Sequence, residues 1–226
     1  MQPQDIFNAL FGRLEDAEID QLVRRWQIMQ RWLAELDRSP ELPPPDTGVG
    51  APDFSLPPEG PLDSITGLTA AFARRDLSPV DHTAGLLDRI ERLDDTLHSH
   101  VTVTRPLALA AARTAELCYR DGAPRGPLDG VPFNLKDIID VAAVRTTCQS
   151  RLRLDVVATR DAPVVAALLA AGAVLTGKSA THEFAFGGPT DDVPFPQPRN
   201  PSDRQRYAGG SSSGAAVALA AGLGHL

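Results

Sequence analysis

The chain has 226 residues, of which 42% are hydrophobic and 23% are charged, and its formal net charge is −7. These proportions are typical of a globular protein and exclude a wholly disordered or fibrous chain. An acidic balance without a basic block argues against nucleic acid as a partner. No apolar stretch reaches the roughly 20 residues that a membrane-spanning helix needs, which argues against a membrane partner. The two cysteines make no disulfide framework and no cysteine–histidine cluster has metal-ligand spacing, so we expect a cytoplasmic protein without a metal.

The first 62 residues are predicted to lie outside the main domain. Apolar residues at helical spacing, among them Ile19, Leu22 and Trp26, predict a helical arm over residues 1–37. Proline is concentrated in the segment that follows, which predicts a proline-rich linker over residues 38–62. We expect the arm to pack on the main body, on a second copy of the chain in a homodimer, or on a small-subunit partner.

Residues 63–226 are predicted to form a single α/β unit. Helices are expected after Ser64, after Ser78 and from Pro106, because serine caps a helix and proline suits its first turn. Short apolar runs predict strands at residues 101–104, 131–135 and 173–176. Two further helices are predicted at residues 163–171 and after residue 214, with a long loop over residues 187–206. Helices that alternate with short apolar strands indicate a layered α/β fold.

One segment has the letters of a phosphate-binding loop. The run from Gly172 to Ser179, GAVLTGKS, matches the pattern G-x-x-x-x-G-K-S. A phosphate loop follows a strand and opens a helix, whereas here a predicted helix precedes Gly172 and the middle of the run is apolar. We therefore expect a buried strand that leaves the core through a turn, and nucleotide binding is the weaker alternative.

Two other segments carry groups suited to catalysis. Lys136 ends the predicted strand 131–135, where partial burial would lower the pKa of its amine and make it a base. The simpler alternative is an ion pair between Lys136 and Asp137. A cluster of serines lies between glycines in GGSSSG at residues 209–214, and the flanking glycines would let a ligand approach closely. The alternative to a functional site is a flexible linker or a plain helix cap. A lysine and a hydroxyl cluster are together the parts of a serine–lysine hydrolase.

The lysine content of the chain is unusual. Only two of its 22 basic residues are lysines, Lys136 and Lys178. Coding bias toward arginine explains this simply. The sharper explanation is that lysine persists where arginine would fail, because lysine can be deprotonated and arginine cannot.

An ordered series of motifs occupies residues 126–214 and carries a resemblance that extends over the chain from Leu68 to its end. The series is GPLDGVPFNLKD at residues 126–137, TTCQS at 146–150, DAPVV at 161–165, AGAVLTGKS at 171–179, EFA at 183–185, RNP at 199–201 and GGSSSG at 209–214. It resembles the N-terminal half of the amidase signature family, and is similar to amidases and to the A subunit of glutamyl-tRNA(Gln) and aspartyl-tRNA(Asn) amidotransferases. The resemblance implies a layered α/β/α fold around a mixed sheet, which we expect the chain to leave incomplete.

The resemblance also implies residue roles. Lys136 would be the base, and Ser211, joined to its neighbour by a cis peptide bond, would relay the proton. Ser212, Asp137, Gly209 and Gly210 would support these two residues. The nucleophilic serine of the family would follow later in the sequence, past Leu226, so the 226 residues by themselves are expected to be inactive.

The implied activity is the cleavage of a carboxamide or related acyl C–N bond. The substrate would be a small-molecule amide, and no organic cofactor would be needed. The alternative from another class is a truncated or split, non-catalytic relative that acts as a binding or assembly partner.

Overall fold

The structure is a computed structural model, and it describes residues 64–225. These belong to one compact unit, residues 59–226. The predicted helical arm, residues 1–37, and the predicted linker, residues 38–62, lie outside the described residues, so both stay predictions. Within the described part of the chain, no helix combines the length and the apolar character that crossing a bilayer requires.

The helices of the first half begin at the capping residues that the sequence predicts. Helix α3 spans Ile65–Arg74, and its cap Ser64 accepts a hydrogen bond from the Gly67 amide at 3.0 Å. Helix α4 spans Pro79–Leu97, and its cap Ser78 accepts from two amides of the first turn. Helix α5 spans Arg105–Arg120 with a proline in its first turn. At Ser64 and Ser78 the side-chain oxygen satisfies first-turn amides that a helix leaves free, which fixes where α3 and α4 start, whereas α5 has no side-chain cap.

Three strands form a mixed sheet in the order β1-β3-β2. Strand β1 spans His100–Val103, β2 spans Pro132–Lys136 and β3 spans Val174–Ser179. Strand β3 is buried along its whole length because it pairs antiparallel with β1 on one side and parallel with β2 on the other. This arrangement confirms the predicted mixed sheet.

The pairing of β2 with β3 contains a bulge. Phe133 pairs with Leu175, but the next residue of β2, Asn134, pairs with Gly177, so Thr176 is an extra residue on β3. The Thr176 hydroxyl donates to the Phe133 carbonyl at 2.9 Å. After the bulge, Lys136 pairs with Ser179. A bulge of one residue changes which side chains of one strand share a face with those of the other.

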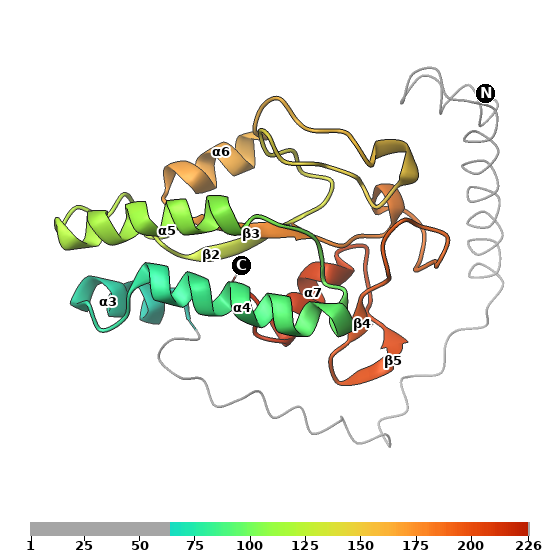
Figure 1. Cartoon of the computed structure of the whole chain (residues 1–226), viewed down its shortest axis with the longest axis horizontal. Coiled ribbons are helices and arrows are strands. Elements are labelled where there is room, and N and C mark those ends of the chain that lie inside the picture. Colours follow the sequence, from blue (N-terminus) through green and yellow to red (C-terminus); the bar gives the residue numbers. More distant parts are fainter. Residues whose placement is uncertain (1–63, 226) are drawn as a thin grey trace, which may run out of the picture. The chain divides into compact units, whose positions relative to one another are not determined.

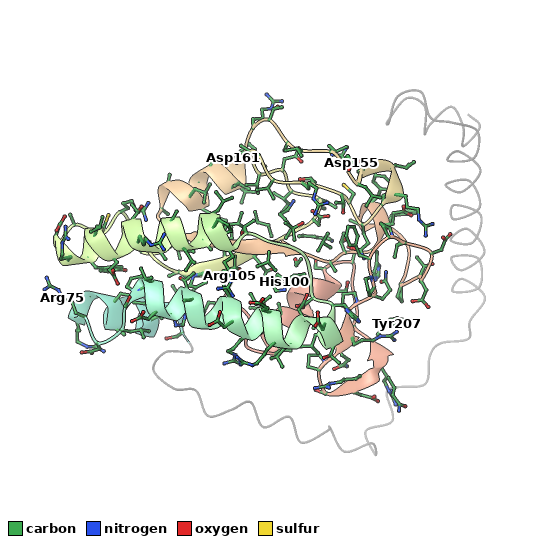
Figure 2. The ribbon with its side chains drawn as sticks, in the orientation of Figure 1. Arg75, His100, Arg105, Asp155, Asp161 and Tyr207 are labelled. Atoms are coloured by element: carbon green, nitrogen blue, oxygen red, sulfur yellow. The ribbon has the colours of Figure 1, made fainter. Side chains whose placement is uncertain are left out.

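Helices cover both faces of the sheet (Figure 1). On one face, called the α6 face, Leu135 and Leu175 pack with Val165 of helix α6, which spans Pro163–Ala170. On the other, called the α7 face, Val174 packs with residues of α4, α5 and helix α7, which spans Ser213–Ala220. Arg105 of α5 joins α5 to α4 through ion pairs with two acidic side chains of α4 (Figure 2). The layered α/β architecture is therefore confirmed.

The prediction of a long loop over residues 187–206 is wrong in its second half. Strands β4, Arg199–Asn200, and β5, Asp203–Tyr207, form an antiparallel hairpin. The Arg199 guanidinium lies 4.4 Å from the centroid of the Tyr207 ring, and Tyr207 is labelled in Figure 2. Because β5 is exposed and charged, it lacks the alternation of apolar residues from which strands are predicted. Two single-turn 3₁₀ helices, η1 (Arg151–Arg153) and η2 (Glu183–Ala185), complete the elements of the described residues.

A histidine pair near the end of the described chain should make stability depend on pH. The Nε2 atoms of His82 and His225 lie 3.0 Å apart, and burial together with the charge of His225 lowers the pKa of His82 from 6.5 to about 4. Between these values the unfolded chain binds a proton that the folded chain excludes, so the free energy of unfolding should fall as pH is lowered from 6.5 toward 4. Denaturant unfolding of the wild type and of His82→Gln checks this. The variant should show a smaller loss over that range, and an equal loss would contradict the assignment.

Candidate active site

The structure brings together two of the side chains that the sequence singles out. Lys136 lies at the end of β2 and Ser211 lies in the glycine-rich loop before α7, and Lys136 Nζ is 2.6 Å from Ser211 Oγ. The peptide bond between Gly210 and Ser211 is cis. Burial lowers the pKa of Lys136 below its ordinary value, because a desolvated ammonium is less stable than a desolvated amine. A neutral lysine amine at this distance can accept the serine proton.

Residues 180–182 hold the loop that carries Ser211. The His182 amide donates to the Ser211 carbonyl at 3.2 Å, and the Gly214 amide donates to the Ala180 carbonyl at 2.9 Å. Glycine is required at two positions here by close approach. A Cβ on Gly210 would lie 2.5 Å from His182 Nε2, and a Cβ on Gly214 would lie 2.3 Å from both the Ala180 amide nitrogen and the Ser99 carbonyl oxygen. The loop is therefore held on both sides of Ser211.

Two of the implied supporting residues make no comparable contacts. Ser212 is exposed, and within residues 64–225 its hydroxyl makes no hydrogen bond. Its backbone, with φ −86° and ψ 46°, is not in the extended conformation that aims a capping side chain at the first turn. Gly209 is exposed, and a Cβ there would meet no atom within 4 Å. Within residues 64–225, Ser212 therefore makes no side-chain hydrogen bond to Lys136 or Ser211, and no close approach requires glycine at position 209.

Asp137 is paired with Lys178, and the suggested ion pair between Lys136 and Asp137 is wrong. Lys178 Nζ donates to Asp137 Oδ1 at 3.0 Å, and both side chains are fully buried. The other carboxylate oxygen accepts from the Thr147 amide at 3.0 Å and from the Thr147 hydroxyl. Successive side chains of a strand point to opposite faces, so Asp137 is directed away from Lys136.

The same contacts exclude the phosphate-loop alternative for residues 172–179. Lys178 is a residue of the buried strand β3, and its ammonium also donates to the Thr146 hydroxyl at 3.0 Å and to the Arg145 carbonyl at 3.2 Å. A phosphate-binding lysine must face the ligand from a loop that opens a helix. Here the lysine has no proton left for a ligand, because an ammonium has three donors and all are used.

Sequence reasoning missed Lys178 as a residue of this site, and it also missed Ser179 and His182. Ser179 pairs in register with Lys136, and its buried hydroxyl has no hydrogen-bond partner within residues 64–225. His182 Nδ1 lies 2.9 Å from the Gly187 carbonyl. The available signal for Lys178 was its rarity, since the only two lysines of the chain lie near the ends of adjacent strands.

Comparison with known proteins places this geometry in a family. Residues 81–226 match the family model described as Amidase. The chain is 44% identical over 155 residues to the A subunit of glutamyl-tRNA(Gln) amidotransferase from Moorella thermoacetica, and the match covers 69% of this chain and 32% of that protein.

Solved structures agree with this match. The peptide amidase from Stenotrophomonas maltophilia is 35% identical, with a TM-score of 0.66 over 71% of this chain and 34% of that chain. A structure described as a vestigial protein complex, which bears on the origins of an s-triazine catabolic enzyme, is 33% identical, with a TM-score of 0.67 over 71% and 35% of the two chains. The chain spans about a third of the length of the curated relatives that it matches. The family match, the relatives and the shared fold together show that the chain belongs to the amidase signature family.

Proposed function

We propose that this chain supplies the base and the proton relay of an amidase that cleaves a carboxamide or related acyl C–N bond. The observation that supports the proposal most directly is the 2.6 Å distance between Lys136 Nζ and Ser211 Oγ. Membership of the amidase signature family makes an enzyme of this general class the expected context. Lys136 is the base and Ser211 is the relay in this proposal.

The proposed reaction uses two proton transfers in sequence. The neutral Lys136 amine accepts the proton of the Ser211 hydroxyl, while Ser211 takes the proton of a second serine, supplied by sequence after Leu226. That serine attacks the substrate carbonyl and forms an acyl-enzyme. The same path returns the proton to the leaving amine or ammonia, and water then releases the acid. Partial burial of Lys136 suits it to the first step because the amine must be neutral to accept a proton.

The proposed substrate is a small-molecule carboxamide. One relative is named as part of an amidotransferase and another as a peptide amidase, so both transfer of the amide nitrogen and simple hydrolysis are open to this site. We further propose that residues 1–37 bind a partner, either a second copy or a small subunit. The chemistry of Lys136 and Ser211 is common to both activities, and only the acceptor of the released group differs.

The proposal is tested by trapping the acyl-enzyme. The longest polypeptide that the reading frame encodes is incubated with a serine-reactive acylating probe, and mass spectrometry locates the adduct. Ammonia release from a panel of carboxamides, with and without hydroxylamine as acceptor, then separates hydrolysis from transfer. We expect an adduct on a serine beyond residue 226 and none on the 226-residue chain alone. Neither adduct nor ammonia from the longest polypeptide would favour the non-catalytic alternative.

A further inference from the structure

The two lysines of the chain lie on opposite faces of the sheet, on either side of one carboxylate. The Asp137 amide donates to the Ser179 carbonyl at 3.0 Å, so Asp137 continues the ladder of β2 by one residue beyond Lys136. Side-chain alternation then directs Lys136 to the α7 face and Asp137 to the α6 face. The register after the bulge pairs Leu135 with Lys178, which directs Lys178 to the α6 face as well. Asp137 therefore meets Lys178 although Lys136 is its neighbour in sequence.

The Asp137 carboxylate is saturated on the α6 face. One oxygen accepts from the Lys178 ammonium, and the other accepts from the amide and the hydroxyl of Thr147. The Asp137 carbonyl also accepts from the Cys148 amide at 2.9 Å, so the main chain here is fixed as well. Without these partners, the Asp137 carboxylate would be an uncompensated negative charge on the residue that follows Lys136. A nearby negative charge favours the charged form of a lysine.

Stability alone does not account for the buried ion pair. Both partners are fully excluded from water, and the cost of desolvating two charges offsets much of their attraction. Replacing a buried ion pair by an apolar pair of similar volume is often neutral or stabilising. The pair instead gives the negative charge of Asp137, the residue next to Lys136 in sequence, a partner of its own.

Of the titratable groups around Lys136, Asp137 is the carboxylate closest to it in sequence. They are Asp137 and Asp140 after the strand, Cys148 in the following loop, Lys178 on β3, and His182 beside the Ser211 loop. Helix α7, which contacts β2, has no titratable side chain. Within residues 64–225, Lys136 makes no ion pair with any acidic side chain.

We propose that Lys178 is a positioning residue that holds the Asp137 carboxylate on the α6 face, so that the Lys136 amine on the α7 face stays without a counter-ion and bonds Ser211. This inference rests on the proposed role of Lys136 as a base. It adds a second lysine to the site, one that never touches the substrate. Its consequence is that the proton affinity of Lys136 depends on the charge balance of the pair behind it.

The test is a double-mutant cycle read by NMR of lysine side chains. The 226-residue chain contains only two lysines, so selective labelling with ¹⁵N and ¹³C gives two side-chain signals, and Lys178→Met assigns them. Lys178→Met leaves an unpaired carboxylate and should raise the proton affinity of Lys136 about tenfold. Asp137→Asn leaves an unpaired ammonium and should lower that affinity. The double variant Lys178→Met with Asp137→Asn has no net charge at the pair and should restore the wild-type titration of Lys136.

A purely structural role of the pair would shift both single variants in the same direction and leave the double variant shifted too. That result, or an unchanged Lys136 titration in Lys178→Met, would overturn the proposal. If Lys178→Met does not fold, Asp137→Asn and the double variant decide the matter by the same criteria. Arg125→Met is the matched control, because it removes the cation from another fully buried carboxylate, Asp129, before the start of β2. It should leave Lys136 unchanged.

The readout separates this inference from the proposed function. If the longest polypeptide of the reading frame is inactive while the cycle in the 226-residue chain behaves as expected, the catalytic role of Lys136 is refuted and the positioning role of Lys178 stands. An active protein in which both single variants titrate like the wild type would refute the positioning role alone.

Discussion

Replacing Lys136 by alanine should reduce the rate of acyl-enzyme formation by about 10³-fold, within the range for loss of a general base. The reason is that Ser211, 2.6 Å from Lys136 Nζ, would then have no acceptor for its proton. Lys136→Arg should reduce the rate as strongly although the positive charge is kept, because a guanidinium cannot act as a base in proteins. The measurement is the rate at which a serine-reactive probe labels the longest polypeptide of the reading frame.

Two comparisons make this expectation specific. Arg105→Ala removes a half-buried basic side chain that joins two helices by ion pairs, and it should leave the labelling rate within twofold of the wild type. The rate in the wild type should rise with pH through a value below the ordinary pKa of lysine, since burial lowers the pKa of Lys136. A Lys136→Arg variant that keeps more than about a tenth of the wild-type rate would contradict the role of base catalyst.

Replacing Gly214 by alanine should destabilise the protein by about 3 kcal/mol, in the upper part of the range for overpacked cores. The added methyl group would lie 2.3 Å from the Ala180 amide nitrogen and from the Ser99 carbonyl oxygen. Both are backbone atoms of buried residues, so relief requires that α7 moves away from the sheet. Because Ser211 precedes α7 by two residues, the same movement should lengthen the contact between Ser211 and Lys136. Denaturant unfolding measures the loss of stability.

Gly85→Ala is the matched control for this substitution. Gly85 lies inside α4, and a Cβ there would meet no atom within 4 Å. Alanine should therefore stabilise the protein by about 0.5–1 kcal/mol, because glycine is the poorer helix former. Equal effects of the two substitutions would show that the close approach at Gly214 is not what limits stability there.

The helix starts could be predicted because their signals are local. Ser78 and Pro79 form a cap and a first-turn proline within two residues, and α4 begins there. The bounds of strand β3 are harder to predict. The predicted strand ends at residue 176, whereas β3 runs to Ser179. Its last residues, Gly177, Lys178 and Ser179, have the composition of a turn, and they are strand because β1 and β2 pair with them from both sides.

The same distinction applies to the site. Lys136 is singled out by its place at the end of an apolar run, and Ser211 by a glycine-rich motif, both of which are local features. The partner of Asp137 could not be predicted in this way, since it depends on the register between strands 41 residues apart in sequence. The exposed hairpin of β4 and β5 was missed for a related reason, because a charged strand is defined by its pairing and not by its hydrophobicity.

The bulge at Thr176 makes the site sensitive to the number of residues in β3 as much as to their identity. Counting forward from the pair of Phe133 and Leu175 without the extra residue would align Lys136 with Lys178. The two ammonium groups would then share one face, and Asp137 would be aligned with Ser179. Inserting one residue between Leu175 and Gly177, with a bulge of the same size, would therefore exchange the partners of three charged side chains without altering any of them, whereas deleting Thr176 would remove the bulge and keep Lys136 opposite Ser179. Natural variation along this stretch should be tolerated as substitution or as loss of Thr176, and rejected as insertion.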